Sequence, residues 1–408
     1  VEKARWSAIT AAQQVPDAKF LLFTGDFVET GTEQNSEWEW EQWFEVSMKP
    51  LLSRMALAPT DGNHDDTPNL NYTYHFNTDK TFNETATVKP QFDGITYSFV
   101  YGDALFMVYS HQDFWRGSYS YANGTSTYLS NDVANWFRDQ VEKYPDTKWR
   151  IAAVHKNLFT GSGHQTDEDG ALFRATLLPV FQELNIDFVI QGHDHIYEVM
   201  GPINNTTKTI VPGSVTNVEL VSPDSNKNPK GQQGGTFNVK DGTLYFVNGT
   251  CGRKRYYPYT QDEMEAGFDK HKVEGYWDLF TGKYGQPGAP AFSEISVSSS
   301  EIEVNTYTSD ANAQATLFDT FKIVKSGNTG IEENKQSAKL YPTYAKDKIN
   351  TIESDIIRVN AIDLTGKIYT LPFDNQHIDV SNLTDGIYVV QIFTNEKTRS
   401  ERIVKTSR

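Results

Sequence analysis

Residues 19–26 read Lys-Phe-Leu-Leu-Phe-Thr-Gly-Asp, a short apolar run that ends in a tight turn and a carboxylate. A continuous apolar run of this length, bounded by polar segments, is typical of a strand buried on both faces. The same pattern, an apolar strand followed at once by polar side chains, returns at residues 55–65, 149–155 and 186–195. Helical patterns separate these runs, so the sequence predicts an α/β domain.

The elements around these strands follow from periodicity and turn residues. Helices are expected at 4–14, 36–55, from 130 to about 141, and at 171–185, where Pro179 would kink the last one. A hairpin is expected at 95–100 and 104–110, around Gly102-Asp103. Further strands are expected at 243–247 and, with alternating periodicity, across 292–324, whereas 202–240 has the composition of a long surface excursion.

The chain divides into two domains at a polar linker. We expect a catalytic domain at residues 1–325, a linker at 326–337 and a small all-β sandwich at 338–408, where short strands alternate with turns. The sequence begins at Val1 inside an amphipathic pattern, with no strand before the first helix. We therefore expect the sequence to be a fragment that lacks its first few dozen residues.

Composition excludes several classes of function. The formal net charge of −16 disfavours a nucleic-acid binder, because that binding depends on Lys and Arg neutralising phosphates. No apolar run approaches the roughly 20 residues that a transmembrane helix needs. The single cysteine, Cys251, excludes an intrachain disulfide and a cysteine-based zinc cluster.

Four strand ends carry the residues that could perform chemistry. The first leads to Thr24-Gly-Asp26, the second to Asp61-Gly-Asn-His-Asp65, the third to His155 and the last to Gln191-Gly-His-Asp-His195. Ligands of α/β proteins bind at the carboxyl ends of the strands, so these turns should converge. Carboxylate, imidazole and amide groups suit a pair of cations that activate water and bind phosphoryl oxygens. A purely structural role for all four turns together is improbable.

These motifs resemble the calcineurin-like metallophosphoesterase superfamily, and within it the purple acid phosphatase branch, over about residues 1–325. The resemblance implies a four-layer α/β/β/α sandwich and a dinuclear centre of Fe, Zn or Mn, whose bound hydroxide attacks the phosphate ester. It also implies roles for individual residues. The metal ligands would be Asp26, Asn63, His155, His193 and His195, with Asp26 bridging; His64 would assist the leaving group, Asp65 would orient His64, and His164 would face the substrate.

Three departures from the family pattern qualify these roles. The first motif, Asp-x-His or Asp-x-Gln, is absent upstream of Asp26. One metal therefore keeps its full ligand set, whereas the other keeps only Asp26 and His195. Glu29 stands where purple enzymes have a tyrosine, so we expect no tyrosinate–iron charge-transfer band. Lys156 replaces a proline that many relatives carry after the histidine.

The C-terminal segment resembles the type IX secretion sorting domain of Bacteroidota. The matching pieces begin with Leu340-Tyr-Pro-Thr-Tyr, include Leu364-Thr-Gly-Lys367 and Leu383-Thr-Asp-Gly-Ile-Tyr388, and close with Arg402-Ile-Val-Lys405. The resemblance implies export across the outer membrane by the type IX machinery, to the cell surface or the medium. An accessory sandwich that binds carbohydrate or another protein is the alternative.

The sequence therefore predicts a secreted phosphatase that hydrolyses phosphate monoesters, with a small phosphate ester as its substrate. A phosphodiesterase or nucleotide pyrophosphatase on the same metal core is the second reading. The loops around 66–92, 111–130 and 202–240 would distinguish the two, because they form the rim of the pocket. A non-catalytic surface binding protein on a decayed phosphatase scaffold is the third reading, and it depends on the missing first motif.

Overall fold

The computed structural model describes most of the chain and divides it into two compact units, residues 1–326 and 327–408. The described residues are 2–31, 35–65, 71–78, 95–111, 130–165, 167–205, 218–220, 234–265, 276–325, 344–351, 355–374, 377–395 and 398–407. Among them, none of the helices combines the length and the apolar character needed to cross a membrane.

The first unit is built on an eight-stranded mixed sheet. Its strand order is β11-β7-β10-β6-β5-β4-β3, and β8 pairs with β7. The four central strands β4, β5, β6 and β10 are parallel, and the outer strands run antiparallel to their neighbours. The bounds are β3 Tyr97–Tyr101, β4 Ala104–Val108, β5 Trp149–Val154, β6 Phe188–Gln191, β7 Tyr197–Asn205, β8 Val218–Leu220, β10 Thr243–Asn248 and β11 Phe280–Gly285.

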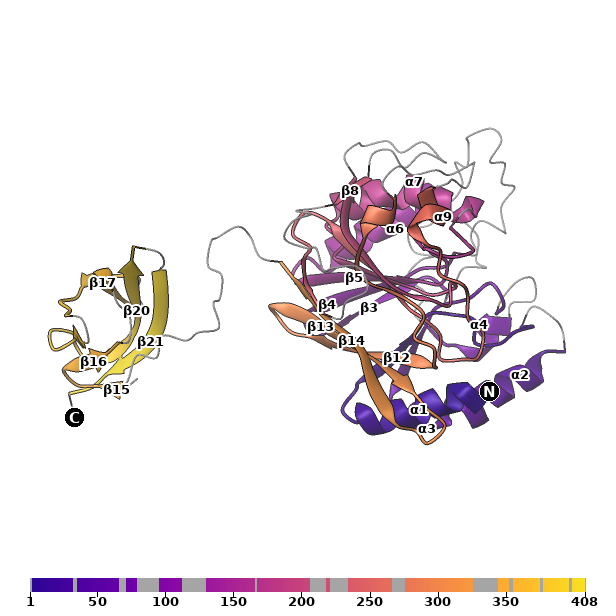
Figure 1. Ribbon diagram of the computed structural model, residues 1–408, viewed down its shortest axis with the longest axis horizontal. Helices are drawn as coiled ribbons and strands as arrows, with labels where there is room; N and C mark the ends of the chain where they lie inside the picture. The colour runs from indigo at the N-terminus through magenta and orange to yellow at the C-terminus, as the bar shows by residue number, and fades with distance from the viewer. Residues whose placement is uncertain are drawn as a thin grey trace. The chain divides into compact units, whose positions relative to one another are not determined.

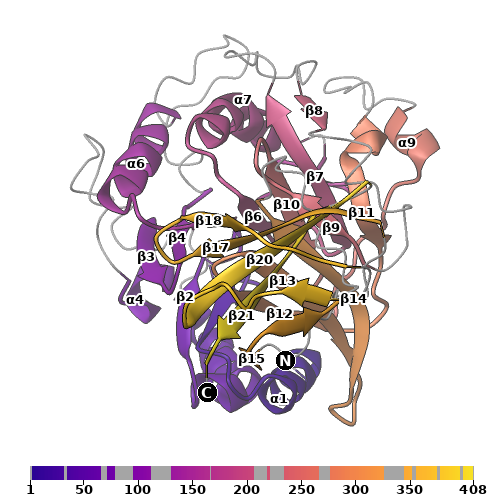
Figure 2. The same cartoon turned by 90° about the vertical axis from the view of Figure 1, so that its left-hand side faces the viewer.

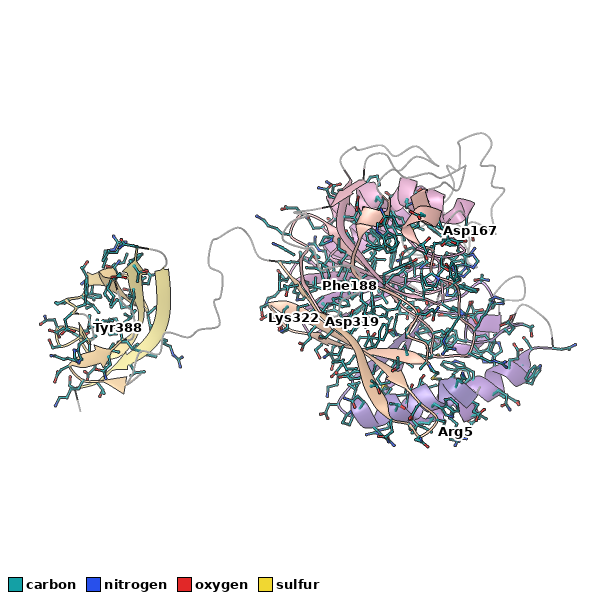
Figure 3. The ribbon with its side chains drawn as sticks, viewed as in Figure 1. Arg5, Asp167, Phe188, Asp319, Lys322 and Tyr388 are labelled. Atoms are coloured by element: carbon teal, nitrogen blue, oxygen red, sulfur yellow. The ribbon has the colours of Figure 1, made fainter. Side chains whose placement is uncertain are left out.

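Two smaller sheets accompany this main sheet. One has the order β12-β13-β14-β9, and the other consists of the parallel pair β1 and β2. Their bounds are β1 Phe20–Phe23, β2 Ala56–Pro59, β9 Thr236–Asn238, β12 Ala291–Val297, β13 Glu301–Ser309 and β14 Ala315–Val324. Apolar side chains of the main sheet, such as Phe188 and Phe246, pack against Phe321 and Ile323 of β14 (Figure 3). The two sheets therefore share one buried core.

Helices cover both outer faces. On one face α6 (Ser130–Lys143) and α7 (Glu168–Glu183) pack on the main sheet through Phe137, Phe181 and their neighbours. On the other face α1 (Glu2–Gln14) lies against β12, β13 and β14. Both views show this order of layers, with α6 and α7 on one side of the sheets and α1 on the other (Figures 1 and 2). The expected four-layer α/β/β/α architecture is confirmed.

The aromatic helix expected at 36–55 is the main error in the predicted elements. The chain forms α2 (Glu37–Glu41), a π-helical turn η1 (Gln42–Ser47) and α3 (Lys49–Leu52). Pro50 lies in the first turn of α3, where a proline is tolerated, but it cannot continue a helix from upstream. The π turn lets both Trp40 and Trp43 reach the core, whereas Trp38 stays exposed.

The remaining short elements of the first unit are α4 (Asn71–His75), α9 (Gln261–Glu265) and the 3₁₀ turn η5 (Tyr276–Leu279). In α7 the helix continues through Pro179. The range expected as a surface excursion contains the end of β7 and the strands β8 and β9, while residues 206–217 and 221–233 lie outside the described residues.

The second unit is all-β. A five-stranded sheet has the order β15-β21-β20-β17-β18, and β16 pairs with β19. The bounds are β15 Tyr344–Ala345, β16 Lys348–Asn350, β17 Ile356–Asp363, β18 Ile368–Thr370, β19 His377–Asp379, β20 Gly386–Thr394 and β21 Thr398–Lys405. Its core includes Val359, Ile378, Val390 and the nearly fully buried Tyr388 (Figure 3).

Candidate metal centre

The turns that follow β1, β2, β5 and β6 meet at one place. Glycines make this approach possible: a Cβ on Gly62 would lie 2.1 Å from the backbone nitrogen of Asp26, and one on Gly25 would lie 2.7 Å from Nδ1 of His155. Gly25 also has a φ of +85°, which disfavours other residues. The convergence that the sequence predicted for these strand ends is therefore present, and it leaves no room for larger residues at the turns.

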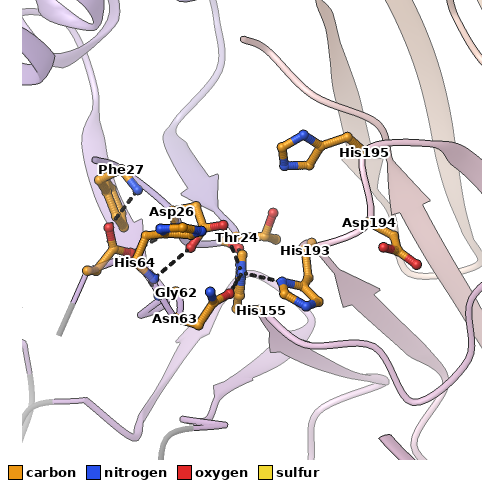
Figure 4. Close-up of polar contacts among 12 residues, drawn as sticks. Thr24, Asp26, Phe27, Gly62, Asn63, His64, His155, His193, Asp194 and His195 are labelled. Carbon is orange, nitrogen blue, oxygen red and sulfur yellow. Dashed lines mark hydrogen bonds and ion pairs between the residues drawn. The ribbon is translucent and has the colours of Figure 1, made fainter. Parts of the chain in front are cut away.

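Four side chains gather around one point (Figure 4). Nε2 of His155 lies 3.2 Å from Oδ2 of Asp26, 3.1 Å from Oδ1 of Asn63 and 3.2 Å from Nδ1 of His193. Asp26 and His193 have φ values of 55° and 61°, a backbone conformation that non-glycine residues adopt at a cost. The fold holds both residues in strained conformations that aim their side chains at the same point.

Three of the site histidines are oriented by backbone carbonyls. His155 donates from Nδ1 to Thr24 O (2.6 Å), His64 to Glu29 O (2.7 Å) and His195 to Lys254 O (3.0 Å). A proton fixed on Nδ1 leaves the lone pair of Nε2 free in the neutral ring, which is how ligating histidines are usually prepared. His193 differs, because its Nδ1 faces His155.

This donor set fits a cation. With its proton on Nδ1, His155 presents a lone pair at Nε2, and the three atoms around that nitrogen are a carboxylate oxygen, an amide oxygen and another imidazole nitrogen. Such atoms repel one another unless a proton or a metal ion lies between them, and a metal ion can contact all four at once. The ligand atoms of Asp26, His155 and His193 all lie within 4.8 Å of one another, which is compatible with a shared ion. The four residues therefore suit Zn, Fe or Mn.

Burial keeps the ligands in the protonation states that metal binding requires. It lowers the pKa of His193 well below its usual value and lowers the pKa of His195 to about 4, so both rings are neutral near pH 7. Burial opposes ionisation of Asp26, but His155 and His64 outweigh it and hold the pKa of this carboxyl below its ordinary range. Burial also lowers the pKa of His155, but Asp26 and the Thr24 carbonyl outweigh it and raise this pKa overall. The site therefore offers one carboxylate and two neutral imidazoles, and His155 gives up a proton more readily to a cation than to water.

Asp65 has a different role from the one expected. Its fully buried carboxylate accepts backbone N–H groups of Asp26 (2.8 Å), Phe27 (2.8 Å), Val28 (3.3 Å) and Gly62 (2.7 Å). The ring of His64 is oriented by the Glu29 carbonyl instead, so the expectation that Asp65 orients His64 is wrong. Four converging N–H groups are a better match for a carboxylate than one imidazole is, and Asp65 therefore braces the turn that carries Asp26.

His195 faces the group from another direction and could share a second cation with Asp26 (Figure 4). It is oriented by Lys254 O, and its ring stacks on Tyr256 with 4.7 Å between centroids and 10° between planes. Among the described residues, the motifs assign only these two ligands to the second position. Glu29, where purple enzymes carry a tyrosine, supplies the carbonyl that holds His64.

His164 lies beside the centre. Its ring centroid is 3.8 Å from that of His193. Nδ1 lies 2.9 Å from Oδ2 of Asp167, and Nε2 lies 3.8 Å from Oδ1 of the buried Asp194. Burial lowers the pKa of His164, but the two carboxylates outweigh it and raise this pKa overall. The side chain can therefore carry a positive charge next to the candidate ligand His193.

Sequence reasoning missed two residues near the centre. His111 is fully buried, its ring lies 5.4 Å from that of His155, and neither ring nitrogen has a hydrogen-bond partner among the described residues. It follows β4, a neighbour of β5, so the signal that found the other sites, a polar residue after a buried strand, was present. Tyr256 follows β10 by a longer turn, and no motif pointed to its stacking on His195.

Comparison with known proteins agrees with this geometry. Residues 4–197 match the calcineurin-like phosphoesterase family, and residues 339–406 match the secretion system C-terminal sorting domain. The chain carries a calcineurin-like phosphoesterase domain. This phosphoesterase domain contains every candidate metal ligand from Asp26 to His195, and the sorting domain corresponds to the β-strand unit that ends the chain.

Individual relatives of the phosphoesterase domain are distant. Two uncharacterized Mycobacterium tuberculosis proteins are 25% identical over 206 residues, covering 47% of this chain and 37% of theirs. Purple acid phosphatase 5 of Arabidopsis thaliana is 31% identical over 87 residues, 21% of this chain and 22% of that protein. The structure of purple acid phosphatase PPD1 from yellow lupin (Lupinus luteus) seeds aligns with a TM-score of 0.50 at 15% identity, covering 79% of this chain and 49% of that one. The chain thus spans less than half the length of the curated relatives that it matches.

Most of the loops expected to set substrate choice fall outside the part of the chain that the structure describes. Residues 66–70, 79–94, 112–129, 206–217 and 221–233 lie outside the described residues. The described part of the rim comes instead from the segment after β10 and from the turn that carries His164.

Proposed function

We propose that this protein is an exported phosphatase that hydrolyses phosphate monoesters at a centre of two cations. The observation that carries the proposal is the convergence of Asp26, Asn63, His155 and His193 around one point, with His64 beside Asp26. When bound, the cations would activate water and neutralise charge on the phosphoryl oxygens. Asp26 would contact both, and His195 would be the other ligand of the second cation.

The protein's own side chains would position the ester and move the proton. His64 is tied to Asp26 by its backbone N–H, which donates to Oδ1 at 3.2 Å, and Nδ1 is held by Glu29 O. In the doubly protonated ring, Nε2 is therefore the atom that would give a proton to the leaving alkoxide. The amide nitrogen of Asn63 and the imidazolium of His164 would donate hydrogen bonds to phosphoryl oxygens as charge develops.

Export supports an extracellular substrate. The matched sorting domain favours passage across the outer membrane by the type IX machinery, after which the protein would be released or held at the cell surface. A small phosphate ester in the surroundings of the cell is then the natural substrate class for a site of this kind.

The test is hydrolysis of p-nitrophenyl phosphate by the protein expressed from its complete gene, with metal content measured in parallel. His64→Ala should lower kcat by roughly 100-fold or more, the usual contribution of an acid–base group, while metal content stays unchanged. Full activity in this variant would refute the role of His64. Faster hydrolysis of bis(p-nitrophenyl) phosphate than of the monoester would favour a phosphodiesterase. Bound metal with no hydrolysis of either ester would favour a binding protein.

A further inference from the structure

The segment after β10 carries a run of positive charge beside the centre. Arg253, Lys254 and Arg255 are the only three consecutive Lys or Arg residues in a chain whose formal net charge is −16. They follow Gly252 directly and precede Tyr256, whose ring contacts the candidate ligand His195. A surface loop can fold without such a run of charges, so their position beside the centre points to a role in binding.

The backbone of this segment is fixed against the centre. Lys254 O accepts the hydrogen bond from Nδ1 of His195 at 3.0 Å. The side-chain amide of Gln286 donates to the carbonyls of His195 and Tyr256, which ties the two residues together. The basic residues are therefore presented at a defined distance from a candidate metal ligand.

The side chains of Lys254 and Tyr256 lie between the two histidines at the rim. The ring of Tyr256 stacks on His195 and lies 5.5 Å from the ring of His164, with 60° between planes. Nζ of Lys254 is 5.4 Å from the centroid of Tyr256.

Arg255 carries donors that have no partner. Its Nη1 donates to Arg253 O at 3.0 Å, whereas Nε and Nη2 are buried and make no hydrogen bond among the described residues. Both nitrogens are shielded from solvent, so these donors are closed to an incoming anion, and Arg255 adds only its positive charge to the segment.

We propose that residues 253–256 form a subsite for a second phosphoryl group, which makes phosphoesters with two phosphates the preferred substrates. The inference rests on the proposed phosphatase function. The reacting phosphoryl group would be met by the cations and His164, and the second phosphate by the ammonium of Lys254, with Tyr256 as the wall between them. In the reaction, water supplies the oxygen to the terminal phosphorus, its P–O bond to the remainder breaks, and the leaving oxygen takes up a proton.

The experiment compares Lys254→Gln with the wild type on p-nitrophenyl phosphate, fructose 1,6-bisphosphate and ADP. The variant keeps the backbone carbonyl that holds His195 and removes only the charge. We expect the KM for fructose 1,6-bisphosphate and ADP to rise about tenfold relative to the KM for p-nitrophenyl phosphate, as expected for loss of one charge-assisted hydrogen bond. Lys240→Gln is the matched control, because this exposed lysine lies at the opposite end of β10 and should change none of the three values.

The outcomes separate this inference from the proposed function. A rise for both two-phosphate substrates supports a phosphate subsite, and a rise for ADP alone supports a subsite for nucleotides. Equal changes for all three substrates, or none, would overturn the inference. If the wild type hydrolyses no phosphoester, the proposed function fails. Calorimetry with methylenediphosphonate still tests the subsite in that case, because Lys254→Gln should weaken the binding of this ligand about tenfold. Unchanged binding would refute the subsite.

Discussion

The two sides of the candidate centre are built in different ways. On one side, His155 and His193 are almost completely buried and meet Asp26 and Asn63 at 3.1–3.2 Å, on turns where a single Cβ would not fit. On the other side, His195 is held by one hydrogen bond to Lys254 O and by stacking on Tyr256. The first side is preformed by the backbone, whereas the second depends on a surface segment.

This difference suggests that the two cation positions differ in how tightly they bind and in how far they can adapt. A position whose ligands are fixed by strand ends, glycines and carbonyl acceptors loses little conformational freedom when a cation binds, so it should bind tightly. A position that depends on a stacked ring and a basic loop can adapt to the substrate. The predictions below test this contrast, starting with the change that should damage the buried side most.

Gly62→Ala should cause the largest loss. The new Cβ would lie 2.1 Å from the Asp26 nitrogen, so the two turns must separate and Asp26 must leave its position. We expect the free energy of unfolding to fall by about 3 kcal/mol, with loss of bound metal. Gly163→Ala is the control, since no atom lies within 4 Å of its added Cβ. Equal thermal stability and metal content in the two variants would show that the turns are not tightly apposed.

Much of this side could be read from the sequence, because it rests on local patterns. Buried strands appear in the sequence as apolar runs, and parallel strands place their carboxyl ends at one edge of the sheet. Glycine marks the positions where two backbone segments come close together. Asp26, Asn63, His155 and His193 each follow such a strand directly, so their convergence follows from topology alone. The same local patterns predicted an α/β domain, whereas the four-layer arrangement came from the resemblance to the metallophosphoesterase superfamily.

What could not be predicted depends on contacts between distant segments. The role of Asp65 is set by N–H groups 37–39 residues away, which no spacing rule identifies. The stacking of Tyr256 on His195 depends on how a turn after β10 folds back. The break at residues 42–47 depends on which tryptophans the core can accept, and helical periodicity alone favoured one continuous helix.

His155→Ala and His195→Ala should separate the two sides by metal binding. His155→Ala removes the nitrogen that contacts three other ligands, and we expect the tightest cation to bind at least about 100-fold more weakly, since even changes outside the ligand shell cost 10- to 100-fold. His195→Ala should leave that cation within about tenfold of wild type and lose the other. Metal per chain, measured by mass spectrometry after dialysis, checks both. Similar losses in the two variants would mean that the positions do not bind independently.

Asp65→Asn tests the brace behind Asp26. The amide keeps the shape of the carboxylate, but its NH₂ group would face backbone donors, leaving at least one of them unsatisfied. We expect a loss of about 2 kcal/mol in the free energy of unfolding, together with weaker metal binding. Asp103→Asn removes the same charge from an exposed pair with Lys148 and should cost less than about 1 kcal/mol. If Asp65→Asn altered only the pH dependence of turnover, Asp65 would act through His64 after all.

Asp167→Asn should have the smallest effect, and it acts on the adaptable side. Asp167 contacts Nδ1 of His164 at 2.9 Å in a partly exposed pair, so its removal should change KM by about two- to fivefold. The carboxylate raises the pKa of His164, and the protonated ring is the form that binds phosphate. Without the Asp167 carboxylate the pKa of His164 falls, so the alkaline limb of the pH profile of kcat/KM should move to lower pH. A limb that stays in place or moves to higher pH would mean that a group other than His164 titrates there, and that His164 serves only to pack against His193.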